Sequence, residues 1–232
     1  MARSLEFRRR WMIGSAVLLT AAPALAAPRQ APPKTKASDA TITATERLMR
    51  NNGVLMRVLV IYDAGIRRLG QDEDIEPSVF IQTGEVMRDF VHAYHEKAEE
   101  EQVFPHFKKA GRMVPLVEVL QAQHQLGQKL TDRILQTAES ARSSKTDRTA
   151  MIEAMQASCT LYRPHMARET TDLLPTLRSL VTPAEFDEIG EALVKREVAL
   201  FGADGLEKVA KRVEALEKRI GIHDLSQFNP KS

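Results

Sequence analysis

The stretch HEKAEEEQVFP at residues 95–105 returns as a spaced pattern in HMARETTDLLP at residues 165–175. In both stretches a histidine is followed four residues later by a glutamate, and that glutamate is followed by a large apolar residue and a proline. A step of four residues places an imidazole and a carboxylate on one face of a helix, one turn apart. The pairs are His95 with Glu99 and His165 with Glu169. The repeat therefore predicts two helices that can direct their pairs into one core.

The rest of the chain has the composition and the periodicity of helices. Aromatic residues make up only 5% of the sequence, and proline and glycine are sparse within the long segments. Apolar residues at steps of three and four predict four long helices, at about residues 43–69, 77–104, 114–138 and 148–174. Two further amphipathic segments follow Pro183 and are expected to pack on the outside or the end of the bundle. We therefore predict an all-α fold, an antiparallel four-helix bundle with additional C-terminal helices.

Three prolines are expected to shape the ends and the path of these helices. Pro105 should end the second helix, and Pro175 should end the fourth. Pro164 lies inside the fourth helix and should kink it, unless a local bulge absorbs the lost hydrogen bond.

The N-terminus has the pattern of an export signal. Three arginines at residues 8–10 precede an apolar run that ends near Ala22, and small residues at positions 24 and 26 suit a signal peptidase. We expect residues 1–26 to be a signal peptide of the twin-arginine type, with an ordinary secretory signal as the alternative. Residues 27–41 are rich in Pro, Lys, Ala and Ser and are expected to form a flexible linker. A helical domain would then cover residues 42–222, and a tail would cover residues 223–232. We expect a periplasmic or otherwise exported bacterial protein whose mature chain has no membrane span.

Charge and cysteine content exclude several classes of function. The formal net charge of +2 includes the basic signal, and no basic stripe suggests a nucleic-acid partner. The chain has one cysteine, Cys159, so no disulfide within the chain can stabilise the fold. We expect Cys159 to be a small buried apolar residue. Stability must then come from packing, with a metal ion as a further contribution.

The repeat extends towards the N-terminus of each half. His124 interrupts the apolar face of the third helix, 41 residues before His165. The first half should hold a counterpart about 40 residues before His95, and the polar interruption of the first helix there is Asn52. By this pseudo-symmetry Asn52 stands where a fourth histidine is expected.

These side chains have the chemistry of a metal site. Without a cation, burying three histidines and two glutamates on apolar helix faces would lower the stability of the fold by several kcal/mol for each unpaired charge. Neutral imidazoles and carboxylates suit Fe, Mn or Zn, and two carboxylates between two sets of imidazoles suit bridging. His92 is interpreted as a residue beside the site or at the surface. The acidic residues Glu96, Glu100 and Glu101 are interpreted as an exposed face, and Tyr162 as a core residue.

The sequence also resembles a known family. The segments YHEKAE (94–99), QHQLG (123–127) and YRPHMARE (162–169) look like the metal-binding segments of bacterial hemerythrin-like HHE cation-binding proteins. NNGVL (51–55) resembles the family's first-helix motif, in which an acidic residue and a histidine usually precede the glycine. The resemblance covers nearly the whole mature chain. It implies a non-haem iron site, most simply di-iron, with the ligands His95, Glu99, His124, His165 and Glu169.

The resemblance also defines what the chain lacks. Asn52 replaces one histidine ligand, and Gln128 stands where oxygen-carrying hemerythrins have a further imidazole. Three outcomes stay open: a labile di-iron site, a single-metal site with iron or another divalent metal, and a metal-free helical scaffold. The expected function is binding or sensing of oxygen, peroxide or another small diatomic ligand, or iron handling. The enzymatic alternative is the reduction of oxygen or peroxide, and the sequence leaves enzyme activity undecided while favouring a binding protein.

Overall fold

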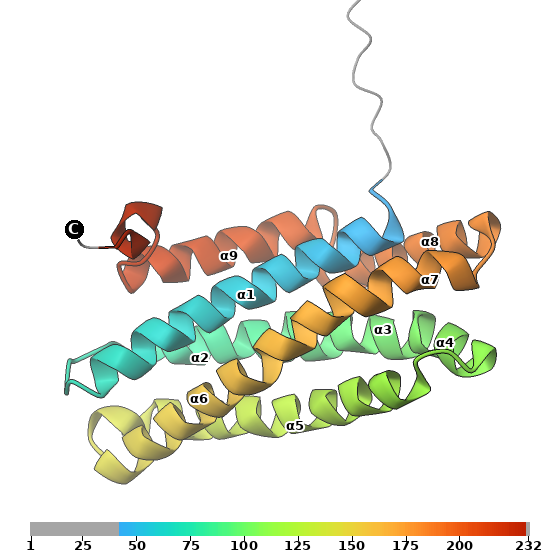
Figure 1. Cartoon of the computed structure of the whole chain (residues 1–232). Coiled ribbons are helices and arrows are strands. Elements are labelled where there is room, and N and C mark those ends of the chain that lie inside the picture. The colour runs from blue at the N-terminus through green and yellow to red at the C-terminus, as the bar shows by residue number, and fades with distance from the viewer. Residues whose placement is uncertain (1–41, 231–232) are drawn as a thin grey trace, which may run out of the picture. The chain divides into compact units, whose positions relative to one another are not determined.

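The computed structural model describes residues 42–230, so the predicted signal and linker lie outside the described residues. Helices, and no strands, form the regular structure of these residues. The first rod of the bundle is α1 (Ala44–Leu69), and the third is α5 (Val114–Ala138). The second rod begins with α2 (Pro77–Val86), and the fourth begins with α6 (Lys145–Arg168). Successive rods run in opposite directions, as the colour gradient in Figure 1 shows. The predicted all-α bundle is confirmed.

Local sequence explains where the helices begin. Thr43 caps α1 and forms a capping box with Glu46, in which each side chain bonds to the other residue's backbone N–H. Thr182 and Glu185 form the same box at the start of α8 (Pro183–Phe201). Pro77 lies in the first turn of α2, where a missing N–H costs no hydrogen bond.

The second and fourth rods each contain a wide, π-helical stretch. In the second rod, η1 (Met87–Glu96) joins α2 to α3 (Lys97–Gln102), and the short helix α4 (Phe104–Ala110) follows. In the fourth rod, η3 (Glu169–Leu173) joins α6 to α7 (Leu174–Leu180). Hydrogen bonds in such stretches run over five residues instead of four, and they occur often at functional sites. Both His-Glu pairs of the repeat therefore lie on or beside a π-helical stretch.

One proline acts differently from the expectation. The fourth rod does not end at Pro175, because the proline lies in the first turn of α7 directly after the wide turn. Pro164 does not interrupt α6, which continues to Arg168. The second rod does break near Pro105, at Val103, whose backbone φ of −112° leaves the helical range.

The C-terminal helices cover one side of the bundle. α8 and α9 (Gly205–Arg219) both pack on α1, and they also contact the second rod through α3 and α2, respectively. Figure 1 shows α9 alongside α1. The short 3-10 turns η2 (Ser140–Arg142) and η4 (Leu225–Phe228) complete the regular structure. Between residues 42 and 230, no helix has the length and the apolar character that crossing a membrane requires.

The apolar interior consists of two separate clusters. One contains Leu55, Phe80 and Ile134 among its members, and the other contains Leu48 and Leu120 among its members. On α1 the residues between the two clusters include Asn51 and Asn52, and on α5 they include His124. A layer of buried polar side chains therefore crosses the bundle between two apolar regions. Cys159 is buried, as predicted.

Candidate metal centre

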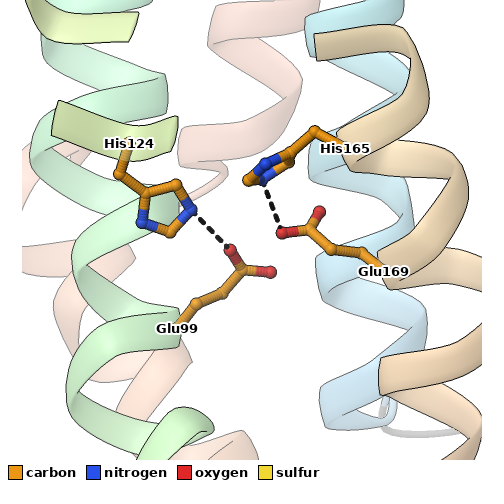
Figure 2. Close-up of side chains that lie close together, drawn as sticks. All are labelled: Glu99, His124, His165 and Glu169. Atoms are coloured by element: carbon orange, nitrogen blue, oxygen red, sulfur yellow. Dashed lines mark ion pairs between the residues drawn. The ribbon is translucent and has the colours of Figure 1, made fainter. Parts of the chain in front are cut away.

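Four of the predicted ligands meet in the polar layer. Glu99 of α3, His124 of α5, His165 of α6 and Glu169 of η3 each offer a ligand atom, and these atoms all lie within 4.8 Å of one another. All four side chains are buried. Figure 2 shows them pointing toward one another, Glu99 from the second rod, His124 from the third, and His165 with Glu169 from the fourth.

Individual distances show how the side chains approach one another. Nε2 of His124 lies 3.7 Å from Oε2 of Glu99, and Nε2 of His165 lies 2.8 Å from Oε1 of Glu169. These are the two contacts drawn in Figure 2. The remaining predicted ligand, His95, lies at the edge of the cluster, with Nε2 at 3.8 Å from Oε1 of Glu99.

Neighbouring polar groups fix the orientation of two of the rings. Nδ1 of His124 lies 3.0 Å from a carboxylate oxygen of Glu100, and Nδ1 of His165 lies 2.9 Å from the amide oxygen of Gln123. Both partners are acceptors, so each ring donates from Nδ1, and Nε2 is the nitrogen that faces the cluster. A metal-binding histidine commonly has this arrangement, because the second ring nitrogen donates to an outer acceptor. The hydrogen bond from His124 also lowers the pKa of Glu100 to about 2.

The electrostatics of the centre favour a bound cation. Burial raises the pKa of Glu99 well above its ordinary value, and the nearby Glu169 carboxylate raises it further. Burial alone would also raise the pKa of Glu169, but the adjacent His165 imidazole outweighs it and lowers this pKa to about 2. Burial lowers the pKa of His95 to about 4. Two carboxylates thus share a buried site, beside an imidazole, that of His95, which is costly to charge.

Several ligand atoms of the centre lack a hydrogen-bond partner. Both carboxylate oxygens of Glu99, Nε2 of His124 and Oε1 of Glu169 are buried without one. Nε2 of His165 and Oε1 of Glu169 are both acceptors when the ring donates from Nδ1, so a proton or a cation has to lie between them. Buried polar atoms are rarely left unpaired. The donor set of two imidazoles and two carboxylates fits Fe, Mn or Zn.

Asn52 also lies in the polar layer. Its Nδ2 donates to Oε2 of Glu169 at 3.1 Å, and its Oδ1 lies 3.0 Å from Nε2 of His95. The carboxamide thus connects the first helix to one residue of each His-Glu pair.

A second buried network lies next to the centre, and it corrects one expectation. Glu96, expected on an exposed face, is 1% exposed. It accepts hydrogen bonds of 2.8 Å from the Tyr162 hydroxyl and from Nδ1 of His92. Nε2 of His92 lies 2.8 Å from the hydroxyl of Thr131. The ring of Tyr162 lies edge-on to that of His165, with 5.7 Å between centroids.

The sequence contained a signal for this network. His92 and Glu96 have the same four-residue spacing as the two pairs of the repeat. The adjacent run of acidic residues concealed it, because a charged run usually faces solvent. The π-helical stretch η1 includes both residues and turns them inward. Glu100 and Gln123, which orient the rings of the centre, had no recognisable signal.

Comparisons with known proteins agree with this geometry. A family model described as the hemerythrin HHE cation binding domain matches residues 43–177. Uncharacterized proteins of Mycobacterium bovis and Mycobacterium tuberculosis are each 38% identical to the chain over 200 residues, which covers 86% of this chain and 78% of each relative. No solved structure matches the chain. The matched range includes every residue of the candidate centre.

Proposed function

The chain belongs to the hemerythrin HHE cation-binding family, and from this premise we propose that it binds iron in the buried His/Glu cluster to bind or sense oxygen or peroxide. One observation supports this most directly: buried carboxylate and imidazole atoms converge on one point without hydrogen-bond partners. A bound cation would satisfy these atoms. A metal-free scaffold would gain nothing from burying unpaired polar groups, which lowers the stability of the fold. Iron bound there would supply redox chemistry toward oxygen or peroxide.

The protein's own residues prepare the place for the ion. Glu100 and Gln123 hold the His124 and His165 rings in the tautomer that binds a metal. The apolar clusters on both sides keep bulk water away from the ligands. The ligands of the centre are thus shielded from bulk water.

Metal analysis of the iron-loaded full chain, with an optical spectrum, tests this function. We expect bound iron at no less than about one equivalent, and a spectrum that changes when oxygen or peroxide is added. Reversal on removing oxygen indicates a carrier or sensor, whereas steady consumption of oxygen or peroxide with a reductant indicates an enzyme. A protein that binds no metal, and whose melting temperature does not change with Fe²⁺, would be the metal-free scaffold.

We also propose that the chain is exported, on the strength of the N-terminal arginines and the apolar run. In a bacterial host, the mature protein should appear in the periplasm and begin at Ala27. Changing Arg9 and Arg10 together to Lys should keep a twin-arginine substrate in the cytoplasm. Unchanged export of this variant would instead identify an ordinary secretory signal.

A further inference from the structure

We propose that the centre holds a single metal ion, bound by Glu99, His124, His165 and Glu169, and that the Asn52 carboxamide occupies the place of a second ion. The proposal deepens the proposed function and rests on it. The side chains around Asn52 carry the argument, because they make the two halves of the repeat unequal.

The four proposed ligands already lie near the spacing that one ion needs. Metal–ligand distances of about 2.0–2.2 Å put ligand atoms on opposite sides of an ion roughly 4 Å apart. One atom from each of the four side chains lies within 4.8 Å of the others, so small side-chain movements would close them on an ion. Between residues 42 and 230, no other group of three or more His, Cys, Asp or Glu side chains has this closeness.

The Asn52 amide has a fixed direction. Its neighbour Glu169 offers a carboxylate oxygen, which accepts hydrogen bonds, so the amide nitrogen must point there, at 3.1 Å. The amide oxygen is thereby turned toward Nε2 of His95, at 3.0 Å. An amide oxygen only accepts, and the His95 nitrogen that faces the centre therefore carries a proton and donates it.

His95 is thus in the opposite state to the other two histidines. His124 and His165 donate from Nδ1 to groups outside the cluster, which leaves Nε2 as the nitrogen that a metal ion can bind, whereas His95 uses Nε2 as a donor to Asn52. Nδ1 of His95 is buried without a partner, so no acceptor stabilises the tautomer that would free its Nε2. The amide and a metal ion therefore compete for the same nitrogen, and the amide is already in place.

The second position also has weaker ligands. A second ion would have one imidazole, that of His95, and the neutral amide oxygen of Asn52, beside carboxylates shared with the first ion. The first ion has two imidazoles, which first-row transition metals prefer to an amide oxygen. The amide further occupies Oε2 of Glu169, an oxygen that could otherwise bridge two ions.

Counting bound metal in the full chain and its variants tests the proposal. The chelator-stripped protein is titrated without oxygen, with Fe²⁺ and separately with Zn²⁺, and the bound equivalents are measured after desalting. We expect one equivalent for the wild type and two for Asn52→His, which supplies the missing imidazole and releases His95. The double variant Asn52→His/His95→Gln is the matched control and should return to one equivalent.

The variant His95→Gln gives an independent measurement that needs no new ligand. It should keep one equivalent, with a dissociation constant raised by no more than about 10–100-fold, because His95 only neighbours the ligands. His165→Gln should lose stoichiometric binding. Circular dichroism establishes that each variant is folded, and if Asn52→His is not, His95→Gln decides.

The outcomes separate this proposal from the function on which it rests. Two equivalents in the wild type would overturn the single-ion centre and leave the metal-binding function standing. No metal in the wild type would overturn both. One equivalent in folded Asn52→His, or loss of binding in His95→Gln, would overturn the assigned role of Asn52.

Discussion

At the scale of single residues, Gly127 shows how closely the buried network is packed. A Cβ atom at this position of α5 would lie 1.8 Å from the hydroxyl oxygen of Tyr162. We expect Gly127→Ala to displace Tyr162 from Glu96 and to lower the free energy of unfolding by about 1–3 kcal/mol, measured by urea denaturation. Gly53→Ala on α1 is the matched control, because no atom lies within 4 Å of its added Cβ. It should stabilise the protein by about 0.5–1 kcal/mol.

The double variant Gly127→Ala/Tyr162→Phe identifies the cause of that loss. Phenylalanine lacks the hydroxyl that the new Cβ meets first, so the two substitutions should cost less together than the sum of their separate costs. Strictly additive costs would contradict the close contact. No residue pattern announces such a glycine, because the need for it arises between α5 and α6 and not within either helix.

At the scale of elements, the sequence predicted the helices better than it predicted their turns. Apolar spacing located the four rods because a helix that packs on a core must repeat its apolar face. The π-helical stretches η1 and η3 escaped prediction, since an added residue in one turn leaves the helical composition unchanged. That turn decides which side of the rod a residue faces, and so Glu96 was placed on the wrong face. The His-Glu pairs were recognisable because their pattern occurs twice.

Attachment of the C-terminal helices to the bundle depends on Glu197 of α8. Its carboxylate pairs with Arg47 of α1, accepts a 3.3 Å hydrogen bond from the Tyr94 hydroxyl, and accepts the backbone N–H of Leu206 in α9 at 2.9 Å. We expect Glu197→Gln to lower the free energy of unfolding by about 3 kcal/mol, because it leaves a mostly buried arginine without its counter-charge. The melting temperature and the urea midpoint should both fall.

An exposed ion pair provides the control for that substitution. Asp63 and Arg163 join α1 to α6, with about half of each side chain exposed. Asp63→Asn should change the free energy of unfolding by no more than about 1 kcal/mol, since solvent screens such pairs. Equal losses in the free energy of unfolding for Glu197→Gln and Asp63→Asn would mean that burial does not make one ion pair more important to stability than the other.

At the scale of the whole molecule, the buried carboxylates of the candidate metal centre lower the stability of the metal-free protein as the pH rises. The raised pKa of Glu99 means that the folded state holds its proton more tightly than the unfolded state, whose value lies near 4.5. Stability of the metal-free protein from this group is therefore complete below pH 4.5 and is lost as pH rises toward the folded pKa. The loss amounts to at most about 1.4 kcal/mol per pH unit.

Glu99→Gln should separate stability from binding. It removes the carboxylate that loses its proton, so the metal-free variant should become more stable than the metal-free wild type as the pH rises, measured by urea unfolding of chelator-stripped proteins from pH 6 to 8. Glu207→Gln, at an exposed position of α9, should leave the pH dependence unchanged.

With metal at 100 times its dissociation constant, the free energy of unfolding of the wild type should rise by about 2.7 kcal/mol, and that of Glu99→Gln by far less. A metal-free Glu99→Gln less stable than the wild type throughout would show that the fold itself depends on the buried carboxylate. If metal-free Glu99→Gln is instead the more stable protein, the buried Glu99 carboxylate destabilises the metal-free fold. Only a bound cation then offsets that loss of stability, which would mean that the centre is maintained for its ion.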